Sequence, residues 1–176
     1  MKFRNILLLF FMALFLSNSA LALSTDREQP INIEANTASI DNIKGVAIYE
    51  GDVIVTQGSI RLTAEKVTLN YSKKQEIEKL IAEGKIARFN QRLDNGEDIT
   101  AQAKLMEYNA LKSMLYLKRA AKLQKSKNGI NSYSSTAPYI TYDTKAGLIK
   151  ANQGGRGGSR KHGRIKMTLK PQPNKK

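Results

Sequence analysis

The side chains that could carry chemistry are few, and their spacing favours binding over catalysis. His162 is the only histidine, and cysteine is absent. Acid–base and nucleophilic catalysis need positioned groups of these kinds, and a transition-metal site needs several nitrogen or sulfur ligands. The glycine-rich stretch 154–158 lacks the Lys-Ser/Thr pair and the helix of a phosphate-binding loop. We therefore expect no enzyme, no metal site and no cofactor.

Basic side chains gather near the C-terminus. The formal net charge is +14. Residues 154–176 contain no acidic residue and the following basic ones: Arg156, Arg160, Lys161, Arg164, Lys166, Lys170, Lys175 and Lys176. Such a run can bind nucleic acid, but outside the cytoplasm phosphorylated sugars and anionic membrane surfaces are the more common counter-charges. We expect a partner of that second kind and no nucleic acid.

Residues 1–22 have the pattern of a secretory signal peptide. Lys2 and Arg4 precede the apolar run 6–16, and small residues follow as far as Ala22, as in cleavable export signals. A membrane-spanning helix needs about 20 apolar residues, which is more than this run offers. We therefore expect cleavage after Ala22 and export of the mature chain.

The remaining chain is long enough for one domain with a core of useful size. We place this domain at residues 23–171 and a basic tail at 172–176. Within the domain, residues 154–162 are interpreted as a flexible glycine-rich and basic loop. Because the chain has no cysteine, its stability must come from burial and backbone pairing.

Beyond the signal, apolar residues alternate with polar ones at a period of two, which predicts many antiparallel strands. Ile31 with Ile33 and Val53 with Val55 are examples. Gly51-Asp52 and Gln57-Gly58 are expected to break these runs. Asn95-Gly96 and Asn128-Gly129 are predicted to form type I′ hairpin turns, because both central residues of that turn need a positive φ.

Two segments carry a helical signal instead. Ser72–Gly84 has apolar residues at helical spacing, a Ser-x-x-Gln box and a terminal glycine, a combination typical of helices. Lys104–Lys118 is rich in helix-forming residues. Local propensity alone slightly favours a helix for the first segment, and a longer-range repeat argues against it.

That repeat centres on three alanines, Ala64, Ala103 and Ala137, each followed three positions later by an aliphatic residue. Repeats at this spacing indicate arrays of one supersecondary unit. In the first copy the apolar positions change from even to odd numbers after Ala64, which needs a bulge or bend. Stacked bent hairpins would form a curved two-layer sheet, that is, a jelly roll or β-taco.

Several blocks resemble the OstA-like (LptA) family of periplasmic lipopolysaccharide-transport proteins. They are residues 29–34, 51–60, 64–67, 91–96, 106–108 and 163–171. The resemblance implies an all-β fold, a bent antiparallel β-jelly roll of about sixteen short strands that is open at both ends. It also implies turn and strand, not helix, for Ser72–Gly84. Arg119, where a glycine is ordinary, and Pro138, within a strand, depart from the pattern.

The resemblance further implies a periplasmic protein, peripheral to membranes, that holds the lipid A acyl chains of lipopolysaccharide in an apolar groove. The residues that we predict to line it are Ile31, Ile33, Ala47, Tyr49, Val53, Val55, Phe89, Met106, Tyr108, Leu115 and Ile140. Each could instead only pack the core, Val55 and Ile140 above all. Ile31, Ile33, Phe89 and Tyr108 are the strongest candidates for lipid contact. The prediction requires an interior that acyl chains can reach.

Partner binding is predicted at two sheet edges. Unpaired edge strands can accept a strand from another subunit, and two unlike edges would associate head to tail. The predicted edge residues are Ile31, Asn32, Ile33, Glu34, Ala35 and Asn36, with Arg164, Ile165, Lys166, Met167, Thr168 and Leu169. The implied partners are an inner-membrane LptC-type anchor and an outer-membrane LptD-type translocon. The alternative is an edge-strand scaffold or polyanion-binding module without lipid cargo.

Overall fold

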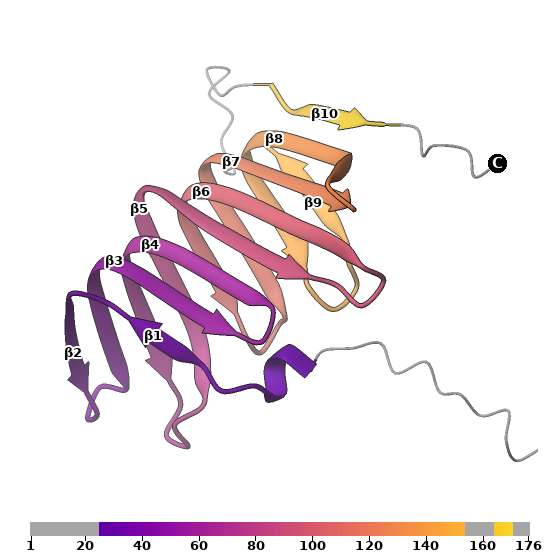
Figure 1. The fold of residues 1–176 in the computed structure, drawn as a ribbon. Coiled ribbons are helices and arrows are strands. Elements are labelled where there is room, and N and C mark those ends of the chain that lie inside the picture. Colours follow the sequence, from indigo (N-terminus) through magenta and orange to yellow (C-terminus); the bar gives the residue numbers. More distant parts are fainter. Residues whose placement is uncertain (1–24, 154–163, 171–176) are drawn as a thin grey trace, which may run out of the picture.

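The structure, a computed structural model, describes residues 25–153 and 164–170, and this part of the chain is almost entirely β-sheet (Figure 1). Its elements are η1 (Thr25–Glu28), β1 (Asn32–Glu34), β2 (Thr37–Asp41), β3 (Val46–Gln57), β4 (Ile60–Tyr71), β5 (Ile77–Arg92), β6 (Glu97–Asn109), β7 (Met114–Lys127), β8 (Ile130–Asp143), β9 (Ile149–Asn152) and β10 (Lys166–Leu169). No helix within these ranges is long and apolar enough to cross a membrane. The predicted signal peptide, the loop 154–162 and the tail 172–176 lie outside the described residues.

All ten strands belong to one antiparallel sheet that does not close on itself. The order is β1-β3-β4-β5-β6-β7-β8-β10, with β2 beside β3 and β9 beside β8. From β3 to β8 each strand pairs with the next along the chain, as short hairpin connections require. Ser72–Gly84 is a turn followed by the start of β5, so the all-β prediction is confirmed against local helix propensity.

Every long strand bends in the middle, which folds the sheet into two layers. Pairing shifts at the bends, for example between Glu50 and Val53 and between Thr63 and Lys66. Figure 1 shows the two layers meeting along the line of bends at the upper left and separating from it. If each of the six bent strands is counted as two halves, these twelve halves and the four short strands make up the sixteen strands expected. The structure has ten because the backbone pairing continues through the bends.

We call the layers first and second. The first layer contains β2, β9 and these strand halves: 46–50, 66–71, 77–83, 105–109, 114–118 and 139–143. The second layer contains β1, β10 and the halves 53–57, 60–64, 87–92, 97–103, 121–127 and 130–137. The change from β1 to β2 therefore carries the chain from the second layer to the first around the bend.

The repeat alanines lie at the bends and let the layers approach each other. Their cross-strand pairs are Val53 with Ala64, Ala87 with Ala103, and Ala121 with Ala137. All six side chains are at most 8% exposed. Because a methyl group needs little space between the layers, the small residues fit where the sheet turns most tightly.

Left-handed backbone marks two of these bends. Gly51 and Asp52 have φ of 83° and 48°, and Arg119 and Ala120 have φ of 64° and 56°. Gly51-Asp52 is therefore a bulge within β3 and not the break that we expected. Arg119 occupies a conformation that glycine adopts without strain, as Gly51 does at the first of these two bends. Pro138 lies between the stretches of β8 that pair with β10 and β9, where no partner needs an amide from it.

The two Asn-Gly hairpins differ. Asn128 and Gly129 both have positive φ, of 52° and 76°, as the predicted type I′ turn requires. At the other hairpin only Gly96 is left-handed, and the Gly96 amide donates to the Leu93 carbonyl at 2.9 Å. That turn is a four-residue one ending in a left-handed glycine, so the type I′ prediction for Asn95-Gly96 is wrong.

Candidate functional site

Apolar side chains form continuous rows across the inside of both layers. Because facing residues of neighbouring strands share a side of the sheet, the register traces each row from edge to edge. The second-layer row is Ile33, Val55, Leu62, Phe89, Ala101, Leu123, Ser135 and Met167. A first-layer row is Ile40, Ala47, Leu69, Leu80, Tyr108, Leu115, Tyr142 and Ile149. The interior is thus largely apolar from β1 and β2 to β9 and β10.

The protein's own side chains fill this interior near the bends, and toward the free ends fully buried side chains such as Leu69 and Leu115 lie among partly exposed ones. Met106, Leu117 and Ile140, one position from the bends, are fully buried. Toward the free ends of the strands lie side chains that pack on the core but remain partly exposed. We call them the mouth residues: Ile60, Tyr71, Ile77, Leu80, Leu93, Tyr108 and Tyr133. Apolar surface that a ligand could reach without unfolding the bends is found at this mouth.

The predicted groove residues separate into three groups. Seven are buried in the core, namely Ala47, Val53, Val55, Phe89, Met106, Leu115 and Ile140. Ile33, Tyr49 and Tyr108 are partly exposed and pack against that core. Ile31 is 41% exposed just before β1. The prediction missed Leu62, Leu69, Leu117 and Leu123, although the same alternation marks them.

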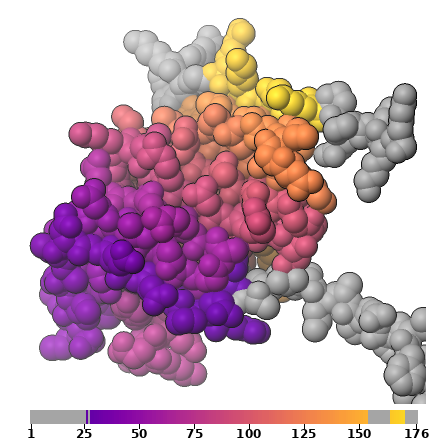
Figure 2. Space-filling view, viewed as in Figure 1, coloured from indigo at the N-terminus to yellow at the C-terminus, as the bar shows by residue number. Residues whose placement is uncertain are grey.

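Both ends of the folded sheet are open, and apolar residues extend into solvent there. Figure 2 shows the N-terminal strands at one end and the C-terminal strands at the other. At the first end Ile40 on β2 is 60% exposed, and at the other end Met167 and Leu169 on β10 are 51% and 77% exposed. The interior rows therefore end in solvent, at surfaces that another sheet could cover.

The predicted partner edges coincide with true edge strands, but they are incomplete. Asn32–Glu34 form β1 and Lys166–Leu169 form β10, and each pairs on one side only. Asn36 marks the crossing between layers, where its amide donates to the Glu50 and Gly51 carbonyls. The prediction missed β2 and β9, the matching edges of the first layer. Both segments alternate apolar with polar residues, but they are only five and four residues long.

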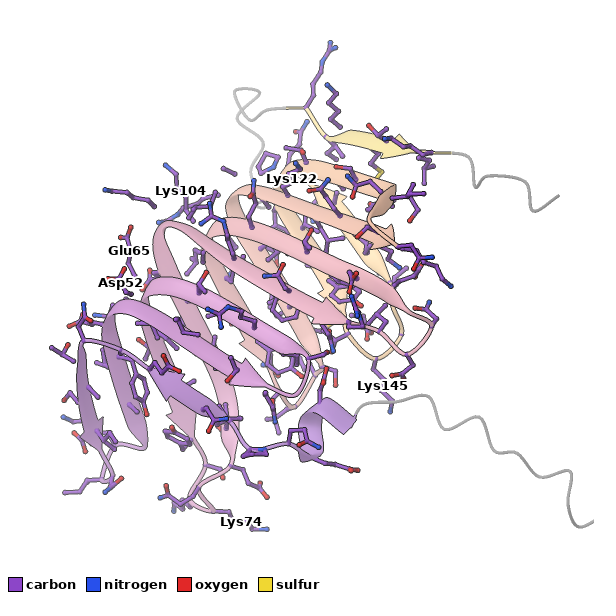
Figure 3. All side chains as sticks on the ribbon, in the orientation of Figure 1. Asp52, Glu65, Lys74, Lys104, Lys122 and Lys145 are labelled. Carbon is purple, nitrogen blue, oxygen red and sulfur yellow. The ribbon has the colours of Figure 1, made fainter. Side chains whose placement is uncertain are left out.

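Four turns connect the strands at the free end of the first layer, and each presents a lysine. In each turn the first residue accepts a hydrogen bond from the backbone N–H of that lysine, which fixes its position. The pairs are Asp41 with Lys44, Ser72 with Lys74, Asn109 with Lys112, and Asp143 with Lys145, at 2.9–3.1 Å. Figure 3 labels Lys74 and Lys145 at two of these turns.

We call Lys44, Lys74, Lys112 and Lys145 the lysine rim. Lys44 forms an ion pair with Asp41 at 2.9 Å. The other three are exposed and have no ion pair with a described residue. Three unpaired ammonium groups therefore line one side of the mouth, where they can meet anions.

The chain N-terminal to β1 is held at the second-layer side of the mouth. The Asp26 carboxylate, 8% exposed, accepts hydrogen bonds from the Ser59 amide at 2.7 Å, the Ser59 hydroxyl at 2.8 Å and the Gln91 side-chain amide at 3.1 Å. Gly58 permits this approach, because a Cβ there would overlap the Asp26 carboxylate. Asp26 thus fixes η1 to the β3–β4 hairpin.

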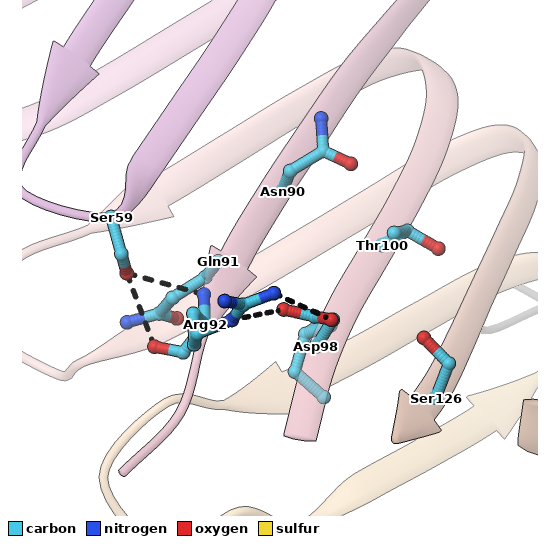
Figure 4. A pocket seen from close by; sticks show the side chains of 8 residues that line it. Ser59, Asn90, Gln91, Arg92, Asp98, Thr100 and Ser126 are labelled. Atoms are coloured by element: carbon cyan, nitrogen blue, oxygen red, sulfur yellow. Dashed lines mark hydrogen bonds and ion pairs between the residues drawn. The ribbon is translucent and has the colours of Figure 1, made fainter. Parts of the chain in front are cut away.

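A pocket of about 430 Å³ lies beside this contact (Figure 4). Two of its lining residues are joined to a third: Arg92 donates to Asp98 at 2.8 Å through Nε and to the Ser59 hydroxyl at 3.1 Å through its backbone amide. Within the described ranges, no group of three or more His, Cys, Asp or Glu residues could hold a metal ion.

Comparisons with known proteins agree with this geometry. The family described as "LptA/(LptD N-terminal domain) LPS transport protein" matches residues 32–148. The lipopolysaccharide export system protein LptH of Pseudomonas aeruginosa is 37% identical over 156 residues, which cover 87% of this chain and 86% of LptH. LptA of Haemophilus influenzae is 36% identical over 145 residues, 80% of each chain.

A solved structure has the same fold. The crystal structure of LptH, described as the LptA-homologous periplasmic component of the lipopolysaccharide transport device of P. aeruginosa, aligns with a TM-score of 0.74 and 31% identity. The alignment covers 84% of this chain and all of that one. With a family match over most of the described strands and relatives above 30% identity, this chain belongs to the LptA/LptD N-terminal domain family of LPS transport proteins.

Proposed function

We propose that this protein is a periplasmic carrier of lipopolysaccharide that takes acyl chains between its two layers at the mouth. The observation that carries the proposal is the set of apolar rows that run from edge to edge and end, at the mouth and at both sheet ends, in partly exposed side chains. Names and functions of the relatives support the same conclusion. The role is binding, and no step of it needs a catalytic group.

Cargo binding requires the layers to move apart at the mouth. The core residues next to the bends are at most 8% exposed, so a chain cannot enter there without disrupting packing. The mouth residues contact the core from one side only, so separating them exposes less apolar area. Each CH₂ group of an acyl chain buried there contributes about 0.8 kcal/mol, which offsets the cost of separating the two layers.

The lysine rim supplies the complementary charge. An acyl chain inserted at the mouth leaves its phosphorylated head group outside, beside Lys74, Lys112 and Lys145. Ammonium groups act as point charges for phosphate. Binding should therefore weaken as salt rises, because exposed charges are screened over about 8 Å at physiological ionic strength.

A photo-crosslinking experiment tests the cargo proposal. A photoreactive amino acid replaces Phe89, which points inward, or Tyr108 at the mouth, and the protein is irradiated with lipopolysaccharide. We expect crosslinks from both positions, stronger from Tyr108, where the side chain is more exposed. The matched control is Asn90, which neighbours Phe89 on β5 but points outward.

Equal crosslinking from Asn90 and Phe89 would show surface adsorption and contradict an internal site. The same outcome would favour the second candidate, a polyanion-binding module that uses basic residues and no groove. That candidate also predicts that removing residues 154–176 abolishes binding, whereas a groove that opens at the mouth retains most of its affinity.

We further propose that the edges join this protein head to tail with other subunits, including membrane-bound partners at each end of the route. The amide of Lys170 donates to the Ser132 carbonyl at 3.1 Å. Amides alternate in direction along a strand, so those of Met167 and Leu169 face away from β8. These free amides are available to a strand from another subunit.

Met167→Pro tests this association without removing a hydrogen bond within the chain. Proline lacks the outward amide, so we expect sedimentation of a monomer at concentrations where the wild-type protein forms larger species. Met167→Ala, which shortens the same side chain and keeps the amide, is the control and should still associate. Deletion of residues 163–176 should likewise leave a folded monomer. If Met167→Pro associates as strongly as the wild-type protein does, β10 is not the edge that joins the subunits.

A further inference from the structure

Two buried hydroxyl groups inside the groove have no hydrogen-bond partner. They are the Oγ atom of Ser135 and the phenol oxygen of Tyr142, and both residues are 0% exposed. Buried polar groups in folded proteins are almost always paired. An unpaired hydroxyl destabilises the protein that contains it, so its presence calls for an explanation.

Both hydroxyls point into the interior, from opposite layers. Ser135 follows Leu123 in the second-layer row, and Tyr142 follows Leu115 in the first-layer row. Apart from Tyr108, every other position of the two rows is apolar. Alanine and phenylalanine would pack at the places of Ser135 and Tyr142 with nearly the same shape and leave nothing unpaired.

The opposite end of the groove treats its hydroxyls differently. In the first layer near β2, burial raises the pKa of Tyr71, and the neighbouring Tyr49 phenol adds to this rise, so these two hydroxyls lie close to each other. Ser135 and Tyr142 both belong to β8, next to the C-terminal edge strands. Their row neighbours toward that edge are exposed or partly exposed, namely Met167 on β10 and Ile149 on β9. A ligand entering from this edge passes those neighbours first.

We propose that Ser135 and Tyr142 form a polar subsite at the C-terminal end of the groove that donates hydrogen bonds to carbonyl oxygens of an acylated lipid. Esters and amides that join fatty chains to a sugar carry an acceptor oxygen at the head of an apolar chain. Two donors set among leucines match that pattern, whereas a plain hydrocarbon offers them nothing. The subsite rests on the proposed carrier function and sharpens it by selecting for ester- or amide-linked chains.

Tyr142→Phe and Ser135→Ala test the subsite with two sugar-linked probes, used below their micelle-forming concentrations. Sucrose monolaurate has an ester carbonyl, and dodecyl maltoside has none. We expect the wild-type protein to prefer the ester probe, and each variant to reduce that preference by about three- to tenfold. The same variants should unfold at a temperature about 2–4 °C higher without ligand, because each removes an unpaired hydroxyl.

Each variant should thus lose ester preference while its unfolding temperature rises. This combination separates a ligand-binding role from a structural one, because removing a hydroxyl that only supports the fold would lower the unfolding temperature. Ser134→Ala and Tyr139→Phe, neighbours on β8 that point outward, are the matched controls and should leave the preference unchanged. An unchanged ester preference in Tyr142→Phe and Ser135→Ala would overturn the subsite alone. Failure of the wild-type protein to bind either probe or lipopolysaccharide would overturn the carrier function itself.

Discussion

The line of bends and the mouth are built from the same alternating strands, but their side chains are packed differently. At the bends, alanines and Val53 face one another across hairpins and are at most 8% exposed. At the mouth, larger side chains such as Leu80 and Tyr108 pack on the core from one side and remain partly exposed. Small residues hold the layers together, whereas large ones leave a surface that can be separated.

If lipid enters at the mouth, as proposed, stability and cargo binding belong to different regions of the same strands. Tight packing near the bends holds the two layers in a fixed geometry, because interiors at crystal-like density tolerate little change in volume. Contacts at the mouth can be exchanged for contacts with a ligand at a small net cost. A protein that must both stay folded and release a lipid gains from keeping these two regions apart.

The largest change in stability is expected from truncating one leucine in each region. Leu117 is fully buried one position from its bend, and Leu80 is a mouth residue. We expect Leu117→Ala to lower the free energy of unfolding by about 3 kcal/mol and Leu80→Ala by about 1 kcal/mol. Urea unfolding of both variants measures the difference. Equal losses would show that the mouth is packed as tightly as the bends.

An enlarged side chain at a bend should have the next largest effect. Ala103 is 0% exposed and faces Ala87 across the β5–β6 pair. Ala103→Leu should lower the free energy of unfolding by about 2 kcal/mol, because the layers cannot close around the added atoms. Thermal unfolding reports the change.

The control for that variant is Ala38→Leu, at an exposed alanine on β2, with an expected change within about 0.5 kcal/mol. If Ala103→Leu is also neutral, the bend has spare volume and the small residues are not what brings the layers together.

The bends could be predicted from the sequence because alternation leaves a trace when it changes phase. The change from even to odd apolar positions after Ala64 indicated the shift that the structure shows between Thr63 and Lys66. The helical spacing in Ser72–Gly84 was misleading, since pairing with β4 and β6 outweighs local propensity. Leu117 and Leu123 followed the same alternation and could have been found.

Other features depend on partners that are distant in sequence. The turn at Asn95 depends on the pairing of Leu93 with Glu97, and the Asn-Gly pair alone cannot specify it. Ser135 resembles any surface serine until the register places it beside Leu123. The strands β2 and β9 alternate apolar with polar residues but are short, and their place at the edge of the first layer follows only from the strand pairing.

Backbone strain at the third repeat allows a smaller test, in which two substitutions to glycine should change the free energy of unfolding in opposite directions. Arg119 has a φ of 64° and is exposed, so Arg119→Gly relieves left-handed strain. It should raise the free energy of unfolding by about 0.5–1 kcal/mol. Arg88→Gly, at an exposed position of β5 without positive φ, should lower it by a similar amount. Urea midpoints give both values, and a loss for Arg119→Gly would mean that the arginine side chain stabilises the bend.

The smallest effect concerns an ion cluster on the outer face of the first layer, behind the mouth. Glu107 lies 2.8 Å from the Lys118 ammonium and 3.4 Å from that of Lys79. The hydrogen bond from Lys118 is the main cause that holds the pKa of Glu107 below its usual value of 4.5. A carboxyl with a lowered pKa stabilises the fold above its unfolded pKa, and this contribution is lost as pH falls through the folded value.

Glu107→Gln should therefore lower the free energy of unfolding by about 0.5 kcal/mol at neutral pH, because the pair is partly exposed to solvent. At a pH acid enough to protonate this carboxyl in the folded state as well, the variant and the wild-type protein should converge, because the contribution of Glu107 is lost as pH falls through its folded pKa. Urea unfolding at the two pH values checks this, with Glu78→Gln, an exposed acid on the same strand as Lys79, as the control. If the difference in free energy of unfolding between the variant and the wild-type protein is the same at both pH values, Glu107 contributes through packing and not through its ion pairs.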